Sequence, residues 1–246
     1  MRTANPALNK KTFEALPRTN DEVMTINGTV NKTAISLVIL LVGALYTWKI
    51  FTETMSVEAI YPWLIGGFIG GFIVALITIF KKTLAPITTP IYALLEGVAL
   101  GGLSAWFESI YPGIVVQAVT LTFGVLFALL FAYRSGLIKV TKNFRLGVVA
   151  ATGGIALVYL ISWLMNMFTG AGIGMIHESG IMGIGFSLFV VVIAALNLVL
   201  DFDFIETGAE QGAPKYMEWY GAFGLIVTLV WLYIEILRLL SKLRSR

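Results

Sequence analysis

The chain has 246 residues, of which 58% are hydrophobic and 13% are charged, and its formal net charge is +3. Soluble domains hold about 45–50% apolar and about 25% charged residues, so a soluble fold of this size would expose too much apolar surface, whereas a bilayer would cover it. There is no cysteine and one histidine, His177. This excludes a disulfide framework, a thiolate or histidine zinc cluster and a histidine-based catalytic triad.

Seven apolar stretches are each long enough to cross a membrane as a helix, which takes about 20 mostly apolar residues. A strand interpretation fails, because the runs are too long and lack the alternation of a half-buried strand. The sequence therefore predicts an all-α integral membrane protein with a polar tail over residues 1–32 and a seven-helix transmembrane domain over residues 33–246. The predicted spans are Thr33–Phe51, Ile60–Phe80, Thr89–Phe107, Gly113–Tyr133, Leu146–Phe168, Gly180–Leu200 and Trp219–Leu240.

Lysine and arginine residues near the span ends indicate the orientation, because cytoplasmic loops are enriched in both. Twelve lysine and arginine residues lie in the tail and in the second, fourth and sixth joints, and the other three joints have none. We therefore expect the amino terminus to be cytoplasmic. Seven crossings then place the carboxyl tail outside, although it is basic. Either the tail is translocated despite its charge, or the last segment does not fully cross; seven full spans are favoured. The cations of this last segment are Arg238, Lys242, Arg244 and Arg246.

Glycines four residues apart predict close helix packing, because they let helix backbones approach each other in lipid. The second span contains "GGFIGGF" and the third contains a further pair. The pairs are Gly66 and Gly70, Gly67 and Gly71, and Gly97 and Gly101.

Acidic residues inside the spans are the most informative polar residues, because an acid at the centre of a membrane helix costs about 2.5–3.5 kcal/mol on insertion scales. Glu96 lies within the third span and Glu235 within the seventh, while Asp201 and Asp203 follow directly on the sixth. Two neutral or basic residues accompany them. Asn197 precedes Asp201 by four residues and shares its helix face, and Arg238 follows Glu235 by three and can pair with it.

Each acid has a structural interpretation beside a functional one. Asp203 and Glu206 are expected to mark the point where the sixth helix ends, Glu235 can form a structural ion pair with Arg238, and Glu96 can hydrogen-bond to a neighbouring helix. The functional interpretation is a carboxylate pair in a poorly hydrated site. Two such groups cannot both ionise cheaply, so they share a proton, and once deprotonated they offer oxygen ligands to Ca²⁺.

The order of several motifs along the chain resembles the Bax-inhibitor family of membrane proteins (the TMBIM superfamily), in its bacterial branch related to YccA. The motifs are "ANPALNKKTFE" near the start, "EGVALGGLSAWFE" followed by "IVVQAVTLTFGVLFALLFAYRSGLIKVT", and "LDFDFIETGAEQGAPKYMEWYGAFGLIVTLVWLYIEILRLL" near the end. The resemblance covers nearly the whole chain. It implies seven helices with the last one central and surrounded by the other six, in the bacterial cytoplasmic (inner) membrane.

The resemblance also implies a site. In the family an acid that ends the sixth span pairs with an acid in the seventh, and the pair acts as a pH sensor for Ca²⁺ leak. On this chain these positions fall on Asp201 and Glu235, which would also be the Ca²⁺ ligands, with Asp203 and Glu96 as substitutes for either. The two departures are a longer joint and a glutamate at the second position.

Two functions follow. The first is a pH-sensitive cation leak channel or exchanger, with Ca²⁺ as transported ion rather than as cofactor. The second is a membrane-embedded regulatory protein that modulates another membrane machine such as a protease, with the tail as a docking or degradation handle. An enzyme is not expected, because no Ser-His, HExxH or glycine-rich phosphate motif is present. The expected surroundings are the lipid bilayer and a membrane protein partner, without nucleic acid.

Overall fold

The computed structural model describes residues 23–170, 173–174 and 178–245. Seven long helices make up nearly all of this part of the chain, and each is long and apolar enough to cross a membrane. The predicted all-α, seven-helix membrane fold is confirmed. In chain order the elements are α2 (Ile26–Thr54), α3 (Val57–Phe80), the 3-10 turn η1 (Lys82–Leu84), α4 (Ala85–Ile110), α5 (Ile114–Arg134), α6 (Lys142–Thr169), α8 (Ile181–Glu210) and α9 (Met217–Arg244).

Two helices extend well beyond the apolar stretches that predicted them. α2 begins at Ile26 rather than Thr33, because the Thr25 hydroxyl accepts the Gly28 backbone N–H at 2.9 Å and so caps the helix. α8 continues to Glu210 instead of ending near Leu200. Polar residues at both sites therefore belong to helices, and their side chains are placed by helix geometry rather than by loops.

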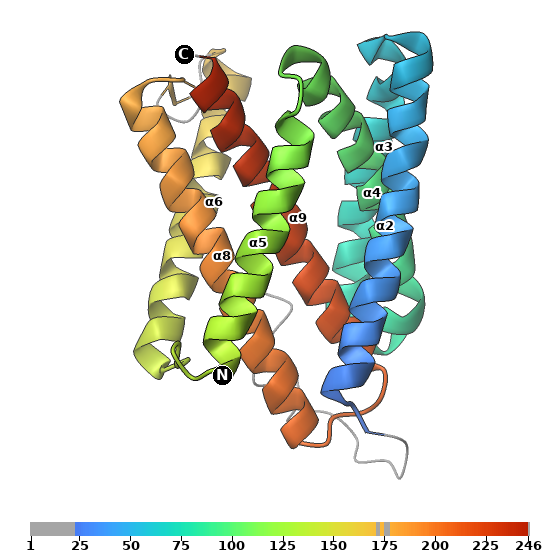
Figure 1. Cartoon of the computed structure of the whole chain (residues 1–246), viewed down its shortest axis with the longest axis vertical. Helices are drawn as coiled ribbons and strands as arrows, with labels where there is room; N and C mark the ends of the chain where they lie inside the picture. The colour runs from blue at the N-terminus through green and yellow to red at the C-terminus, as the bar shows by residue number, and fades with distance from the viewer. Residues whose placement is uncertain (1–22, 171–172, 175–177, 246) are drawn as a thin grey trace.

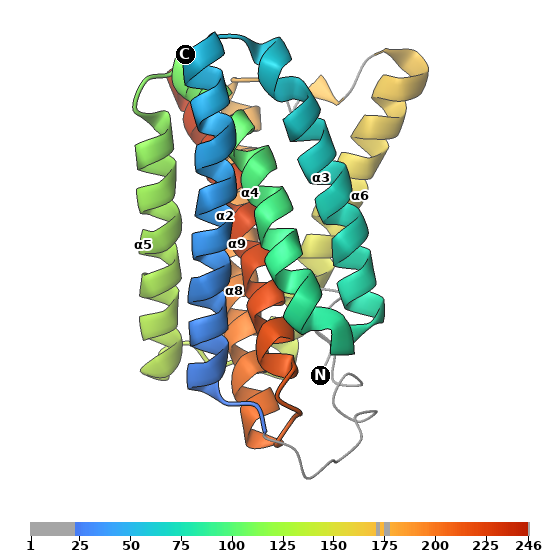
Figure 2. The same ribbon diagram turned by 90° about the vertical axis from the view of Figure 1, so that its right-hand side faces the viewer.

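α9 is the central helix, as predicted. It packs directly against α2, α4, α5 and α8, and 67% of its most apolar window is buried, more than in any other span. α3 packs on α4, and α6 packs on α8 (Figures 1 and 2). Among the described helices, α8 is the one that α6 contacts extensively. α6 is therefore an outer helix of the bundle.

Glycine contacts join α2, α3 and α4. A Cβ atom at Gly97 or Gly101 would overlap the Leu40 or Ala44 backbone carbonyl oxygen of α2, so only glycine allows this close approach. On α3, a Cβ at Gly67 would lie 2.7 Å from a backbone oxygen of α4. Predicted glycine packing is therefore confirmed at these positions, whereas Gly66 has open space around it.

The bundle has two ends. The lower end, at the bottom of Figure 1, holds the start of α2, the joint between α5 and α6, and the joint between α8 and α9; the upper end holds the end of α9. α9 thus runs through the whole bundle, which agrees with seven full spans.

Protein groups bind two of the cations in the last turns of α9. Lys242, 5% exposed, donates to the Gly183 carbonyl at 3.1 Å and to the Ser187 hydroxyl at 2.9 Å. Arg244 donates to the Pro112 carbonyl at 2.7 Å. The charges that argued against a full crossing therefore take part in packing, while Arg246 lies outside the described residues. One further cation lies at the same end of the bundle: Lys49, inside the first predicted span, is near the upper end of α2.

Candidate functional site

Three side chains of α6, spaced seven residues apart, bind polar residues of α8 and α9. Seven residues are close to two helical turns, so the three lie on one face of α6 at three heights. We call Arg145, Thr152 and Tyr159 the α6 row. Their partners, all singled out from the sequence, are Asp203, Asn197 and Glu235 respectively.

The upper contact of the α6 row surrounds Glu235, which is 2% exposed on α9. The Tyr159 hydroxyl lies 3.1 Å from both carboxylate oxygens. Arg238 Nη1 lies 2.8 and 3.0 Å from the same two oxygens and donates to the Tyr159 hydroxyl at 2.8 Å. The Arg238 guanidinium also covers the Tyr159 ring, 5.4 Å from its centroid. The Glu235–Arg238 pair suggested by the sequence is therefore present, with a tyrosine as third member.

The middle contact belongs to Asn197, which is 3% exposed on α8. Its side-chain amide donates to the Thr152 hydroxyl at 2.9 Å and to the Ile193 carbonyl at 2.8 Å. Asp201 follows one turn later on α8 and is completely buried. The two residues share a helix face, as their spacing predicts.

Asp201 and Glu235 lie at different heights in the bundle. Asp201 precedes the end of α8 at Glu210 by nine residues, and Glu235 follows the start of α9 at Met217 by eighteen. At 1.5 Å per residue these are about 13.5 and 27 Å from the lower end, so the two acids differ in height by about 13.5 Å along the helices. The structure therefore does not bring them into contact. Most of the chain between the two acids is helical, since α8 continues to Glu210 and α9 begins at Met217.

The lower contact belongs to Asp203, whose carboxylate lies 2.5 Å from the Arg145 guanidinium. Glu206, one turn later, accepts a hydrogen bond from the Tyr133 hydroxyl of α5. The expectation that Asp203 and Glu206 end the sixth helix is wrong, because α8 continues to Glu210. Both acids instead join α8 to neighbouring helices.

Glu96 forms a separate buried site between α4 and α3. It is 7% exposed, and its carboxylate would lie 2.8 Å from a Cβ at Gly71 of α3. Tyr92, one turn earlier, interacts with this carboxylate and packs its ring edge-on against Phe223 of α9. Glu96 Oε2 has no hydrogen-bond partner among the described residues. The structure thus separates Glu96 from the α6 row.

Glu218, which the sequence analysis did not single out, is a completely buried acid in the first turn of α9. It accepts hydrogen bonds from the Thr25 backbone N–H at 3.0 Å and hydroxyl at 2.9 Å, and it pairs with Lys32 at 2.7 Å. An acid in a first helical turn is favoured by the helix dipole, and this was the available signal. These contacts tie the start of α2 to the start of α9.

Within residues 23–170, 173–174 and 178–245, no three histidine, aspartate or glutamate side chains lie close enough together to hold a metal ion. Ca²⁺ takes 6–8 oxygen ligands. Asp201 and Glu235, at different heights, do not form a shared site, and His177 lies outside the described residues.

A bundle of seven apolar helices with buried acids around its central helix defines the class of the protein: it is a multi-pass α-helical membrane protein. A family model described as Bax inhibitor 1 like matches residues 5–245. The chain belongs to this family, within the TMBIM group that its motifs resemble. Comparisons with curated proteins and with solved structures give no match.

Proposed function

We propose that the protein is a pH-sensitive cation leak pathway or exchanger, with Ca²⁺ as the transported ion, in a bacterial cytoplasmic membrane. The observation that carries this proposal is the burial of Asp201, Glu235 and Glu96 inside membrane-spanning helices. Intramembrane acids are costly and are retained mainly where they serve ion paths or proton relays. The resemblance to a family with a carboxylate pH sensor supports the same conclusion.

The α6 row supplies a mechanism for the pH dependence. The Arg145–Asp203 pair depends on a charged carboxylate, and so does the cluster of Glu235 with Arg238 and Tyr159. Protonation would weaken both contacts and leave α6 held mainly by an apolar cluster in which Ile155 packs against Val190 and Ile193 of α8. Movement of α6 away from α8 would then expose Asp203 and Glu235, so we expect faster flux at lower pH.

Ca²⁺ flux into liposomes that hold the purified protein, at pH 6 and pH 8, tests the proposal. We expect flux at least several-fold higher at pH 6, and a smaller difference in an Asp201→Asn/Glu235→Gln double variant, in which the Arg145–Asp203 pair remains. Glu53→Gln is the matched control, because that side chain is 64% exposed near the upper end of α2. Folded protein without flux at either pH would overturn the proposal, as would a double variant with unchanged pH dependence.

A second candidate function is regulation of another membrane machine such as a protease. It is favoured by the way the segment before α2 is attached to the joint between α8 and α9. Val23 forms a β-bridge with Pro214, and the Met24 N–H donates to the Ala213 carbonyl at 2.6 Å. A force or partner acting on residues 1–22 would therefore act at the α8–α9 joint. Deletion of residues 2–22 should then abolish co-purification of a membrane protease and leave ion flux unchanged.

A further inference from the structure

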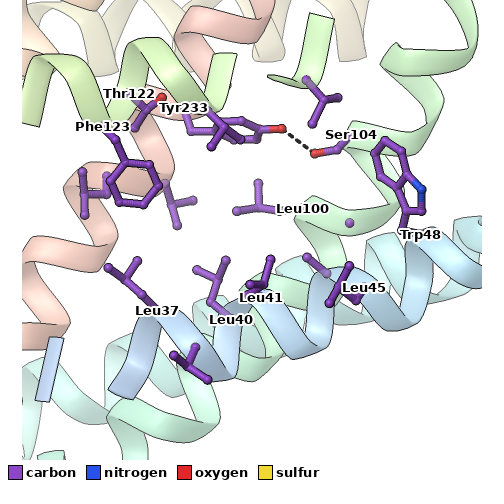
Figure 3. A pocket seen from close by; sticks show the side chains of 17 residues that line it. Leu37, Leu40, Leu41, Leu45, Trp48, Leu100, Ser104, Thr122, Phe123 and Tyr233 are labelled. Atoms are coloured by element: carbon purple, nitrogen blue, oxygen red, sulfur yellow. Dashed lines mark hydrogen bonds between the residues drawn. The ribbon is translucent and has the colours of Figure 1, made fainter. Parts of the chain in front are cut away.

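A pocket of about 560 Å³ lies between α2, α4, α5 and α9 (Figure 3). Leu37, Leu41 and Leu45 line it from α2, and Val119 and Phe123 line it from α5. Leu41 and Leu45 are 55% and 57% exposed, which shows that the pocket opens sideways on the α2 face rather than toward either end. α2 and α5 both pack against α9 and make no comparable contact with each other. The opening between them therefore faces the lipid.

The pocket is lined mostly by apolar side chains, and its hydroxyl groups all have hydrogen-bond partners. Its lining contains three side-chain hydroxyl groups, and each of them is already hydrogen-bonded. Ser104 and Tyr233 bond to each other at 2.6 Å, and Thr122 donates to the Ala118 carbonyl at 2.7 Å. Apolar cavities without polar partners stay free of water and bind apolar ligands. A hydrocarbon occupant is thus favoured over water or an ion.

The length and depth of the pocket match one leaflet of a bilayer. Its lining on α2 runs from Leu37, near the middle of that helix, to Trp48, near its upper end. These eleven steps span about 16 Å at 1.5 Å per residue, and half of a hydrocarbon core of about 30 Å is about 15 Å. Lys49 follows Trp48 near the upper end of α2, with a side chain that is 73% exposed and lies 3.6 Å from the exposed Glu53 carboxylate. A lipid phosphate at this level would compete with Glu53 for the Lys49 charge.

We propose that this pocket binds one acyl chain of a glycerophospholipid from the leaflet at the upper end, with the lipid head group beside Trp48 and Lys49. The site is independent of the proposed ion path, because its lining contains no acidic residue.

Tryptophan quenching tests the proposal in liposomes. The chain has six tryptophans, so a variant that keeps only Trp48 is made by replacing the other five with phenylalanine. It is reconstituted with phosphatidylcholine whose acyl chains carry bromine. Val119→Phe fills the pocket from α5, and Val116→Phe makes the same change three residues earlier, where the side chain is 71% exposed and outside the lining. Native mass spectrometry of each variant in detergent counts retained phospholipid.

We expect Trp48 to be quenched, with at least twofold less quenching in Val119→Phe and no change in Val116→Phe. One retained phospholipid should disappear in the first variant and persist in the second. Equal quenching in all three proteins would show ordinary boundary lipid and overturn the proposal. If Trp48 is not quenched in the folded protein, no acyl chain lies beside it, and this result would overturn the proposal as well. Circular dichroism confirms helix content in each case.

Discussion

The close contact between Gly28 and Glu218 leads to a prediction about Gly28→Ala. This substitution should destabilise the wild type and stabilise a variant in which Glu218 is alanine. A Cβ at Gly28 would overlap the Glu218 carboxylate, so Gly28→Ala must displace a buried acid. Moving this acid breaks its hydrogen bonds to Thr25 and its ion pair with Lys32. When Glu218 is replaced by alanine, the three atoms nearest to the added methyl group are removed.

The magnitudes decide the sign in each background. Breaking a buried pair costs about 3–5 kcal/mol, and the lower end applies because the Lys32 side chain is 22% exposed. Alanine is favoured over glycine in a helix by up to about 1 kcal/mol. Gly28→Ala should therefore lower the unfolding free energy by about 2 kcal/mol in the wild type. In the Glu218→Ala background it should raise the unfolding free energy by up to about 1 kcal/mol, because only the helix-propensity gain remains.

Unfolding in mixed micelles, followed by circular dichroism as the fraction of dodecyl sulfate rises, measures all four members of this cycle. A coupling free energy of about 2–3 kcal/mol is expected. Glu210→Gln serves as the control, because Glu210 is exposed at the end of α8 and should leave the effect of Gly28→Ala unchanged. Equal effects of Gly28→Ala in both backgrounds would refute the reasoning, and so would a stabilised Gly28→Ala single variant.

Two further predictions concern packing and orientation. Gly101→Ala should destabilise the bundle by at least about 2 kcal/mol, since the new methyl group would overlap the Ala44 carbonyl, while Gly124→Ala on α5 meets nothing within 4 Å and should be neutral or stabilising. Unfolding midpoints of the two variants check this, and similar losses would contradict it. The chain lacks cysteine, so single cysteines report topology directly: in cells, an impermeant thiol reagent should label Ser56→Cys at the α2–α3 joint and spare Ser135→Cys at the α5–α6 joint. The opposite pattern would reverse the orientation.

The sequence predicts the bundle well because apolar length and glycine spacing are local signals. Gly97 and Gly101 were assigned to close helix packing from their four-residue spacing, and their contacts with α2 confirm this. The Glu235–Arg238 pair was also foreseeable, since both members lie within one turn of one helix. The ion pair joins residues that are close in sequence, and the glycine contacts require only the absence of a side chain.

The remaining features depend on contacts between distant segments. Tyr159 lies 76 residues before Glu235, and no local pattern indicates that its hydroxyl reaches that carboxylate. Asp203 was expected to end a helix, because a charge after an apolar run usually does, but its pairing with Arg145 allows the helix to continue. The height difference between Asp201 and Glu235 follows from the length of both helices below them, which hydropathy alone understates.

α9 is anchored at both ends, by Glu218 to the start of α2 and by Arg244 to the α4–α5 joint. A one-turn shift along its own axis would move it about 5.4 Å and break both anchors at once. Any rearrangement that keeps both anchors must therefore hold α9, the start of α2 and the α4–α5 joint together as one unit. α6, whose extensive contact among the described helices is with α8 alone, is then the helix that can move relative to this unit, and distances from a label on α9 to one on α6 would report that motion.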